Sequence, residues 1–467
     1  MRIKLDQKDK LTSFALEVAA SLKKGGFRAF FVGGSVRNII LKRPSDNLDI
    51  ATDCLPDKVE AILKAGKIRS KPIGKQFGTI LATRDGLIVE ITTFRKEGFY
   101  KDRRHPSSVE FTKNLSQDAK RRDFTINALY LNLETKEVID ETGGLKDLRA
   151  RLIRFVGNPR DRIDEDSLRM LRAVRIATQL GLSAKSGPAS GWKIEKKSFA
   201  AIKTRAKFIQ DVSGERIKGE LDKILLSQNR CDGIRLLDSS GLLQFIIPEI
   251  SALKKFSHDS KEFHLEGNMF EHTLLALEKA PFDPNLAYAI LFHDIAKPMK
   301  AKKEPNETFV RTKGHAEAGA EIFRKFANKI KFTRKNLELI EWAIAKHMDI
   351  LRFNSLSEEE QARLALQPNI EFLMLLSKAD DEANLRYDEE GRNISGTSKN
   401  RKAAEKFLKK VRPNLERIKQ FVDGHKIMRL SNLKPGQELG QTIDDVKVQI
   451  VLGKIKNTSE LKNYLQK

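Results

Sequence analysis

The chain has little cysteine, since Cys54 and Cys231 are the only two among its 467 residues. Two cysteines exclude a disulfide framework and a zinc site built from cysteine alone. Long apolar runs are also absent: the longest uninterrupted one, Leu286 to Phe292, is far shorter than the roughly 20 residues that cross a bilayer. The first ten residues are charged and have no apolar core, so we expect no secretory signal. These absences predict a soluble protein of a reducing cytoplasm, with no membrane partner.

Acidic residues are too few to balance the basic ones. The 87 Lys and Arg residues face 63 Asp and Glu, which gives a formal net charge of +24. A hydrophobic content of 40% argues against a disordered, collagen-like or coiled-coil chain, and the length suggests roughly three domains. A strong basic excess favours polyanions, because each neutralised phosphate releases condensed counterions. We therefore expect a nucleic-acid partner, with a merely solubilising surface as the alternative.

The order of the predicted elements indicates an α+β fold, a small mixed head on a long helical body. Strands are expected at 29–32 and 48–51, and strand pairs at 79–83 with 88–92 and at 128–133 with 137–140. From Arg162 onward, apolar residues recur at helical spacing. The predicted domains are a head at 1–155, a helical neck and body at 156–258, a histidine-rich helical domain at 259–390 and a basic helical tail at 391–467.

The head has a glycine pair and an acidic strand, which together suit a nucleotide. Gly33 and Gly34 lie between a predicted strand and a helix start, where backbone N–H groups and the helix N-terminus favour phosphate oxygens. Farther on, Asn47 and Asp49 stand two residues apart at a predicted strand. Residues i and i+2 of a strand point to one face, so these two side chains are candidates for a shared metal site.

These motifs resemble a known family. The segments 32–37 (VGGSVR) and 48–52 (LDIAT) are similar to the head of the DNA polymerase beta-like nucleotidyltransferases. Matches at 89–95, 104–106, 121–128 and 165–175 narrow the resemblance to the bacterial-type tRNA CCA-adding enzymes and poly(A) polymerases. The resemblance implies a DNA polymerase beta-like head, a helical neck, and nucleotidyl transfer by two Mg²⁺ ions without a nucleic-acid template. RNA 3′ ends, CTP and ATP are the implied substrates.

The same resemblance assigns roles to individual residues. It places the Mg²⁺ ions at Asn47 and Asp49, the triphosphate at Gly34 and Arg37, and the ribose at Arg122 and Asp123. Asp166 and Arg169, three apart on a predicted helix, would select C or A, and Arg172 and Arg175 would extend this row toward the phosphates. An exposed face of helical ion pairs is the alternative for this row. The candidate nucleotide-binding residues are Gly33, Gly34, Arg37, Arg122, Asp123, Asn127, Asp166, Arg169, Arg172 and Arg175.

Two positions depart from the family pattern. Asn47 stands where the family has Asp, and it offers a carbonyl oxygen without the negative charge, so metal binding and transfer should be weaker. Asp46 would point to the opposite face of the strand and could replace it only if a β-bulge turned its side chain. Asn38 also stands where Asp is usual. Glu90, on a neighbouring predicted strand, is a candidate third carboxylate.

Histidine is concentrated in one region, because six of the eight lie between His258 and His347. The order of the His and Asp residues resembles the HD superfamily of metal-dependent phosphohydrolases, and the segment 263–268 resembles HD units fused to such heads, although Asn268 stands where Asp is usual. The alternative is that these histidines are ordinary core or surface residues and not metal ligands. The resemblance implies a divalent transition metal or Mg²⁺ at His272, His293, Asp294 and Asp380, and a second ion at His315 and His347. It implies hydrolysis of 2′,3′-cyclic or terminal phosphates on RNA.

The tail adds two weaker signals. Between Arg392 and Lys419 ten Lys or Arg residues face two Glu, which fits either a solvated helix face or an RNA-contacting arm. The segment 430–440 is similar to the tail of the fused enzymes, where it meets the tRNA.

The sequence therefore predicts a tRNA nucleotidyltransferase that adds or repairs the 3′ CCA end, with an HD phosphohydrolase activity on RNA ends. A poly(A) polymerase, or an enzyme that adds only CC or only A, stays open, because the difference lies around 100–106 and Asp166. A different class also stays open, an RNA-binding HD phosphohydrolase whose head is weakened by Asn47. A plain RNA-binding protein leaves the ordered motifs unexplained. No oligomeric state is indicated.

Overall fold

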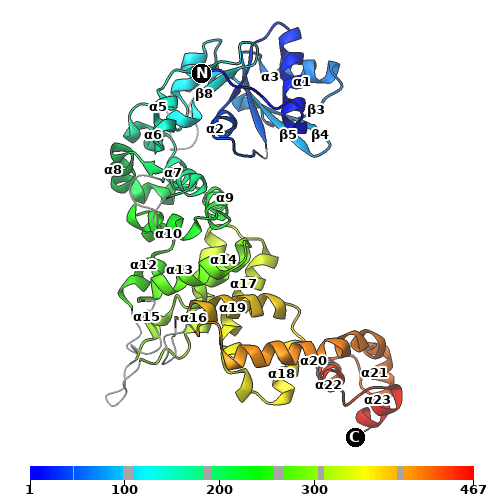
Figure 1. The fold of residues 1–467 in the computed structure, drawn as a ribbon. Helices are drawn as coiled ribbons and strands as arrows, with labels where there is room; N and C mark the ends of the chain where they lie inside the picture. The colour runs from blue at the N-terminus through cyan, green and yellow to red at the C-terminus, as the bar shows by residue number, and fades with distance from the viewer. Residues whose placement is uncertain are drawn as a thin grey trace. The chain divides into compact units, whose positions relative to one another are not determined.

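The computed structural model describes residues 1–45, 47–97, 109–182, 191–256, 267–302, 310–385 and 394–466. The chain divides into two compact units, Met1–Ile246 and Ile247–Lys467. A mixed sheet followed by helices in the first unit, and helices in the second, confirm the predicted α+β head and helical body (Figure 1). Asp46, the segments around 100–106 and 263–266, and most of a loop that the sequence predicts at 185–191 lie outside the described residues.

The first unit begins with a seven-stranded sheet in the order β3-β4-β5-β2-β1-β8-β9. The pairs are antiparallel except for β2 with β5, which is parallel. The strands of the unit are β1 (Ala29–Val32), β2 (Leu48–Thr52), β3 (Arg69–Gly74), β4 (Thr79–Arg84), β5 (Leu87–Thr93), β6 (Arg95–Glu97), β7 (Val109–Phe111), β8 (Leu129–Asn132), β9 (Val138–Asp140), β10 (Leu152–Ile153) and β11 (Lys193–Ile194). Every strand that the sequence predicts is therefore present in the sheet.

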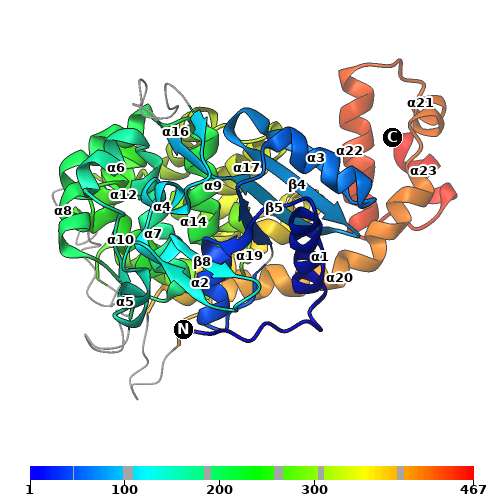
Figure 2. The same ribbon diagram turned by 90° about the horizontal axis from the view of Figure 1, so that it is seen from above.

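Helices cover the sheet and continue into the neck. Seen from above in Figure 2, α1 and α3 lie on the same face of the sheet. The other face carries a buried cluster that includes Phe30, Ala51 and Tyr130. The helices of this unit are α1 (Lys10–Lys24), α2 (Gly34–Ile40), α3 (Pro56–Ala65), α4 (Leu115–Lys120), η2 (Thr125–Asn127), α5 (Gly144–Arg149), α6 (Pro159–Glu165), α7 (Leu168–Leu180), α8 (Lys196–Arg205), η3 (Ala206–Asp211), α9 (Gly214–Leu225), α10 (Arg230–Ser239) and α11 (Leu243–Ile246), with the short turn η1 (Lys75–Phe77) before β4.

The neck is tied to the head through the end of α7. Arg43, in the loop after α2, donates to the backbone carbonyls of Gln179 and Leu180 at 2.8 Å each. The last carbonyls of a helix have no partner within it, and a guanidinium satisfies two of them here. This contact holds the loop that leads to β2 against the neck.

The second unit is helical in its described residues. Its elements are α12 (Pro248–Ala252), η4 (Leu253–Lys255), α13 (Met269–Lys279), α14 (Pro284–His293), α15 (Lys297–Lys300), α16 (His315–Lys329), α17 (Arg334–Leu351), η5 (Phe353–Ser355), α18 (Glu358–Ala365), α19 (Ile370–Ala383), α20 (Lys399–Phe421), α21 (Gly424–Ser431), α22 (Gln437–Val451) and α23 (Thr458–Leu465). Phe292 of α14 packs against Phe323 and Phe326 of α16. A buried ion pair of 2.9 Å between Arg401 and Asp381 joins α20 to α19.

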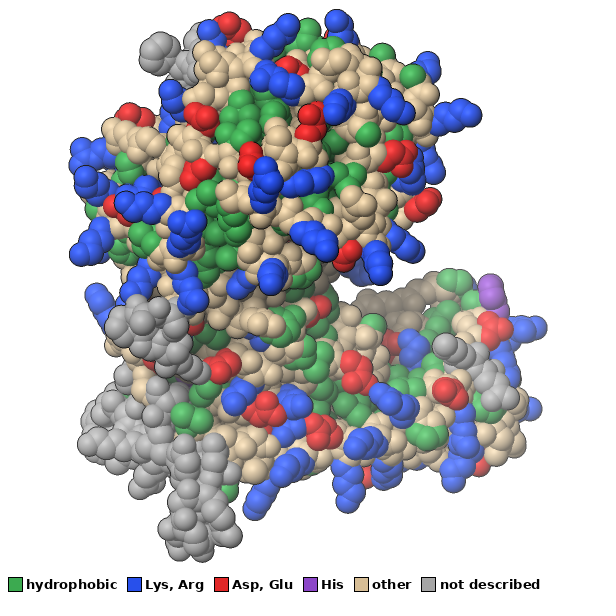
Figure 3. All heavy atoms as spheres, turned by 45° about the horizontal axis from the view of Figure 1, so that its top comes forward, with side chains coloured by type: hydrophobic (Ala, Val, Ile, Leu, Met, Phe, Trp, Pro, Cys, Tyr) green, Lys and Arg blue, Asp and Glu red, His purple; other side chains and the backbone are tan. Residues whose placement is uncertain are grey.

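The basic side chains are spread over the face of the molecule that Figure 3 shows. On the face drawn in Figure 3, Lys and Arg side chains are scattered over both units, with Asp and Glu between them. Many of them form ion pairs, as Arg84 does with Glu17 at 2.5 Å. No helix within the described ranges is both long and apolar enough to span a membrane.

Candidate functional site

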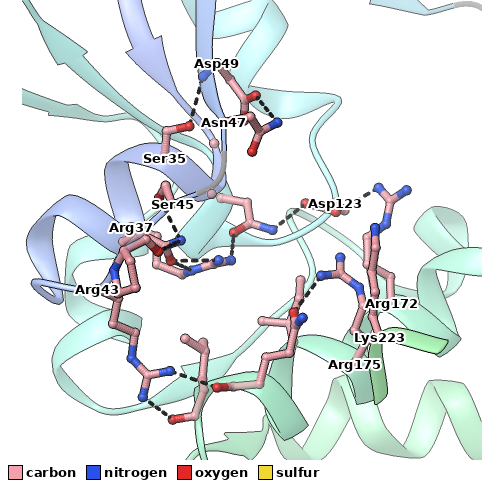
Figure 4. A pocket seen from close by; sticks show the side chains of 18 of the residues that line it. Ser35, Arg37, Arg43, Ser45, Asn47, Asp49, Asp123, Arg172, Arg175 and Lys223 are labelled. Atoms are coloured by element: carbon pink, nitrogen blue, oxygen red, sulfur yellow. Dashed lines mark hydrogen bonds and ion pairs between the residues drawn. The ribbon is translucent and has the colours of Figure 1, made fainter. Parts of the chain in front are cut away.

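A pocket of about 870 Å³ lies where the glycine turn, β2, η2 and two neck helices meet in the first unit (Figure 4). It brings together ten of the residues that the sequence singled out for the head and its row of arginines. They are Gly33, Gly34, Arg37, Asn47, Asp49, Arg122, Asp123 and Asn127, and Arg172 and Arg175 join them from α7. Segments more than 100 residues apart in the sequence thus build one cavity.

The glycine turn leaves room for groups at the floor of this pocket. Gly33 has φ 72°, a left-handed conformation that favours glycine. A Cβ atom at this position would lie 3.4 Å from Oδ2 of Asp49 and 3.6 Å from Nη1 of Arg122. Ser35, in the first turn of α2, accepts a hydrogen bond of 2.9 Å from the backbone N–H of Asp49. The turn, the strand and the arginine therefore converge on one spot.

The strand register gathers the oxygen ligands. Asn47 immediately precedes β2, and its Nδ2 donates to Oδ1 of Asp49 at 3.4 Å. Glu90 of β5 is the register partner of Asp49 in the parallel pair, so both side chains point to the same face. Burial, followed by repulsion from Glu90, raises the pKa of Asp49 to about 6, and burial raises the pKa of Glu90. Buried carboxylates that repel one another favour a bound cation, and an all-oxygen set suits Mg²⁺.

A chain of polar contacts links the glycine helix to the neck. Arg37 of α2 donates to Oδ1 of Asn127 at 2.6 Å, and Nδ2 of Asn127 donates to Asp123 at 3.2 Å. Arg172 donates to the other oxygen of Asp123 at 3.1 Å. Burial, followed by the nearby Arg175, lowers the pKa of Arg37 to about 10. Arginines this close to one another favour an anion between them.

Arg122 is held from behind by two buried side chains. Its Nε donates to the Tyr130 hydroxyl at 2.9 Å and its Nη2 to Asp118 at 3.0 Å, while the Tyr130 hydroxyl donates to Asp118 at 2.5 Å. Burial raises the pKa of Asp118, but Arg122 and Arg121 outweigh it and lower that pKa to about 2. The network fixes the guanidinium with Nη1 directed toward Gly33 and Asp49.

Asp166 and Arg169 are not brought into the lining of this pocket. The expectation that they share one helix is wrong, because Asp166 is the C-cap of α6 in an extended conformation and α7 begins only at Leu168. The physical reason is local: Oδ1 of Asp166 accepts the backbone N–H of Leu168 at 3.1 Å, a bond that competes with the helix.

The charged ends of these two residues have partners elsewhere. Oδ2 of Asp166 pairs with Arg216 of α9 at 2.8 Å, and Arg169, which is 7% exposed, pairs with Glu165. Asp166 nevertheless stays close enough to Arg172 to raise its pKa, although burial and Asp123 act more strongly there.

Sequence reasoning missed the pocket residues on α9 and the loop before β2. Glu220, Lys223 and Gln228 line the pocket from the neck, and Arg43 lines it from the loop. Glu220 pairs with Arg175 across the two neck helices. The α9 residues belong to no motif, and only the packing of α7 on α9 brings them to the cavity, so the sequence offered no signal for them.

A second cluster lies in the second unit. His272, His293, Asp294 and Asp380 are all buried and each offers a ligand atom within 4.8 Å of the others. Asp294, His315 and His347 form a second such group, so Asp294 belongs to both. Its Oδ2 lies 3.2 Å from Nε2 of His293, and its Oδ1 lies 3.3 Å from Nε2 of His315. Five helices, α13, α14, α16, α17 and α19, and the residue after α14 supply these side chains.

The hydrogen bonds of the imidazoles show that this cluster fits a cation. Nδ1 of His293, His315 and His347 each lies 2.7 or 2.8 Å from a backbone carbonyl, which can only accept, so each Nδ1 donates. Each Nε2 then turns a lone pair inward when the ring is neutral. Nε2 of His293 is buried and faces carboxylate oxygens of Asp294 and Asp380 at 3.2 and 3.5 Å, and the Nε2 atoms of His315 and His347 are 3.2 Å apart. Such lone pairs and carboxylates suit a divalent metal.

The carboxylates give this buried cluster an excess of negative charge, which a bound cation would offset. Burial lowers the pKa of His293, but Asp294 and Asp380 outweigh it and raise that pKa to about 10. Burial and His293 lower the pKa of His347 to about 4. Lys297 also contacts Oδ2 of Asp294 at 2.6 Å.

Asn268, the departure from the family pattern, caps α13 by accepting the backbone N–H of Glu271 at 3.1 Å, and Asn is a strong capping residue.

Comparisons with protein families place three domains along the chain. The model of the poly A polymerase head domain matches residues 29–154, that of a probable RNA and SrmB-binding site of polymerase A matches 191–254, and that of the HD domain matches 268–385. Both the nucleotidyltransferase and the HD domains imply dependence on a divalent metal.

Curated relatives match either nearly the whole chain or about half of it. A CCA-adding enzyme of Streptococcus thermophilus is 30% identical over 454 residues, which cover 96% of this chain and 94% of that one. One of Anoxybacillus flavithermus is 40% identical over 241 residues, 52% of this chain and 57% of its own length. The chain thus spans little more than half the length of some curated relatives it matches. The structure of the Bacillus stearothermophilus CCA-adding enzyme in complex with CTP, at 24% identity, has the same fold, with a TM-score of 0.68 over 98% of this chain and 97% of that one.

Proposed function

Because the chain belongs to the family of CCA-adding enzymes, we propose that it adds or repairs the 3′-terminal CCA of tRNA from CTP and ATP. The observation that supports this most is the single cavity in which a buried acidic strand, a glycine turn and a row of arginines meet. Its electrostatics suit a nucleoside triphosphate with a divalent ion. The arginines that face one another favour the phosphates, and the repelling pair Asp49 and Glu90 favours the ion.

The residues of the pocket would have different roles in the proposed reaction, namely metal binding and triphosphate binding. Asp49, Glu90 and the carbonyl oxygen of Asn47 would hold Mg²⁺, which when bound activates the RNA 3′-hydroxyl and stabilises charge on the leaving pyrophosphate. The N–H groups at Gly33 and Gly34 and the guanidinium of Arg37 would bind the triphosphate.

The other arginines would orient the nucleotide. Tyr130 and Asp118 hold Nε and Nη2 of Arg122, which leaves Nη1 directed toward Gly33 for the substrate. Arg172, which donates a hydrogen bond to Asp123, would position the ribose of the nucleotide. Asp166 and Arg169 remain our candidates for choosing C or A, with Arg216 and Glu165 as the side chains that orient them.

An omission assay tests this function. Purified protein with Mg²⁺ is incubated with a tRNA transcript that ends at the discriminator base, and with labelled CTP, ATP, GTP or UTP. We expect incorporation from CTP alone, and from ATP only when CTP is also present. Incorporation of ATP alone into this transcript would favour a poly(A) polymerase, and no incorporation would contradict the proposal.

Restoring the acidic pair should raise the rate. The Asn47→Asp change adds a carboxylate beside Asp49, where Nδ2 of Asn47 now lies 3.4 Å from Oδ1. The added charge binds the ion more tightly, so we expect CTP incorporation at limiting Mg²⁺ to rise about tenfold. Initial rates over a Mg²⁺ titration measure it. A rate that is unchanged at every Mg²⁺ concentration would show that position 47 is not a metal ligand.

Lys223 provides a second prediction, since it lines the pocket without a hydrogen bond or ion pair to any described residue. A free ammonium in such a pocket suits a substrate phosphate. The Lys223→Ala change should raise the KM for tRNA about tenfold. The matched control is Lys218→Ala on the same helix, because Lys218 pairs with Asp222 at 2.6 Å. KM values for tRNA, CTP and ATP that all stay within twofold would contradict a substrate contact.

The His and Asp cluster supports a second activity, metal-dependent hydrolysis of 2′,3′-cyclic or terminal phosphates on RNA. His272, His293, Asp294 and Asp380 would hold one ion, and Asp294 with His315 and His347 a second. The metal, when bound, supplies a hydroxide at neutral pH. Protein loaded with Ni²⁺, Co²⁺, Mn²⁺ or Mg²⁺ and given a cyclic phosphate tests it, and inertness with all four would contradict it.

The domain limits follow the same proposal. We propose 1–155 as the transferase head, 156–258 as neck and body, 259–390 as the phosphohydrolase domain and 391–467 as the tail. An exposed stripe of lysines along α20 supports an RNA contact for the tail, because the side chains recur every three or four residues on one face. They are Lys399, Lys402, Lys406 and Lys409.

A further inference from the structure

A groove in the second unit lies apart from the metal-binding cluster. It has a volume of about 410 Å³ and is lined by side chains of α17, of the connection that follows it, and of α18. Trp342, Lys346 and Asp349 line it from α17 at spacings of four and three, which put them on one face of that helix. The buried face of the same helix carries Ile344 and His347, the latter directed into the cluster. One face of α17 therefore lines the groove, and the other contributes to the metal-binding cluster.

The groove combines an aromatic wall with a basic rim. Trp342 is half-buried, and leucines at 356 and 364 add apolar surface. Three cations line it, Lys346, Arg352 and Arg363, and their side chains are 49%, 63% and 49% exposed. An indole beside flexible cations is the combination that binds unpaired nucleotides, with the base on the ring and the phosphate on the cations.

Two of the three cations of the rim are available to a phosphate, whereas Arg363 pairs with Asp445 of α22. Lys346 and Arg352 share a single carboxylate, Asp349, at 3.4 and 2.5 Å. Exposed ion pairs of this kind contribute little stability, so they exchange readily for a stronger anion. The other acid, Glu360, is engaged in the capping box of α18 with Ser357 at 2.8 Å. Its carboxylate therefore serves the helix end.

We propose that this groove binds one unstacked nucleotide of the RNA substrate, with the base against Trp342 and the phosphate on Lys346 and Arg352. The proposal rests on the proposed function, because it takes its ligand from the RNA that the head would extend. The cavity is of nucleotide size, and Gln367 at its edge offers hydrogen bonds to a base. The groove would hold the RNA at a second point, independent of the transferase pocket.

The intrinsic fluorescence of Trp342 tests this directly. The chain has two tryptophans, and the other, Trp192, is 5% exposed, so the Trp192→Phe variant reports on Trp342 alone. Titration with a tRNA transcript that ends at the discriminator base should quench the emission, because a base stacks on the indole. The Lys346→Ala/Arg352→Ala double variant should raise the Kd for this tRNA about tenfold. The Arg334→Ala/Lys335→Ala double variant, which removes two exposed cations from the first turn of α17, is the charge-matched control and should leave the Kd unchanged.

The outcomes separate the groove from the transferase. Unchanged emission and an unchanged Kd in the double variant, with CCA addition intact, would overturn the groove and leave the proposed function standing. Failure of the parent protein to bind or extend the tRNA would overturn the proposed function, and the groove with it. Equal weakening by the Lys346→Ala/Arg352→Ala variant and by the Arg334→Ala/Lys335→Ala variant would reduce the effect to net charge and also overturn the groove.

Discussion

The Asp49→Asn change is expected to lower CTP incorporation about a thousandfold. Asn47 already lacks a charge, so this change leaves Glu90, among the described residues, as the only carboxylate facing the proposed ion. Loss of metal-based charge stabilisation removes several kcal/mol from the transition state, and each 1.36 kcal/mol is a factor of ten. Initial rates at saturating tRNA and Mg²⁺ measure the effect.

The stability of the same variant should move in the opposite direction. Folding raises the pKa of Asp49 from its usual value of 3.8 to about 6, so the ionised carboxylate disfavours the folded state at pH 7. Asparagine removes that cost, and the melting temperature in metal-free buffer should rise. This rise should vanish below about pH 4, where the carboxyl is protonated in both states.

A matched control separates the site from a general effect. Asp85→Asn makes the same chemical change in the exposed turn between β4 and β5, where φ is 49° and Asn is well tolerated. It should leave the rate unchanged. An Asp49→Asn protein that keeps its rate within threefold of the parent would refute the metal assignment.

The second large effect concerns Asp294, because both ligand groups of the second unit contain it. The Asp294→Ala change should remove tightly bound metal from that unit altogether, since each oxygen of this carboxylate faces a different set of histidines. Metal content after dialysis, by inductively coupled plasma mass spectrometry, gives the stoichiometry. Hydrolysis of a 2′,3′-cyclic phosphate should fall at least about a hundredfold.

Stability supplies a readout that does not depend on activity. Metal that binds only the folded state raises the melting temperature, so the parent protein should gain stability on metal addition and the Asp294→Ala variant should not. Asp444→Ala, a 61% exposed aspartate on α22, is the control and should keep both the metal and the thermal shift. Full metal occupancy in the Asp294→Ala protein would contradict the assignment of this cluster.

Local patterns predicted the strands that carry the site. The run 29–32 with its glycine pair, and the turn at Asp85 and Gly86 between two alternating runs, are signals that a few neighbouring residues create. The strand β3 was not predicted, because its residues are almost all exposed at the sheet edge and include a proline, so no apolar alternation marks it. Alternation of apolar and polar residues marks a strand only where one of its faces is buried against other elements, and β3 has no such face.

The candidate site was predicted where chemistry is local and missed where it depends on packing. The glycine turn, the acidic strand and the histidines are short motifs, and the structure gathers them into two clusters. Lys223 and Glu220 reach the pocket only because α9 packs on α7, a contact between helices with no shared motif. Asp166 lies outside the predicted helix because its own side chain accepts the backbone N–H of Leu168. This local competition is not visible in the spacing of apolar residues.

Sequencing the extended 3′ ends tests the central claim most directly. A tRNA transcript that ends at the discriminator base is incubated with the protein, Mg²⁺, and CTP, ATP, GTP and UTP together, and the products are ligated and sequenced. We predict that growth stops after three nucleotides, in the order C, C, A. Tails of many adenosines, or ends left at the discriminator base, would contradict it.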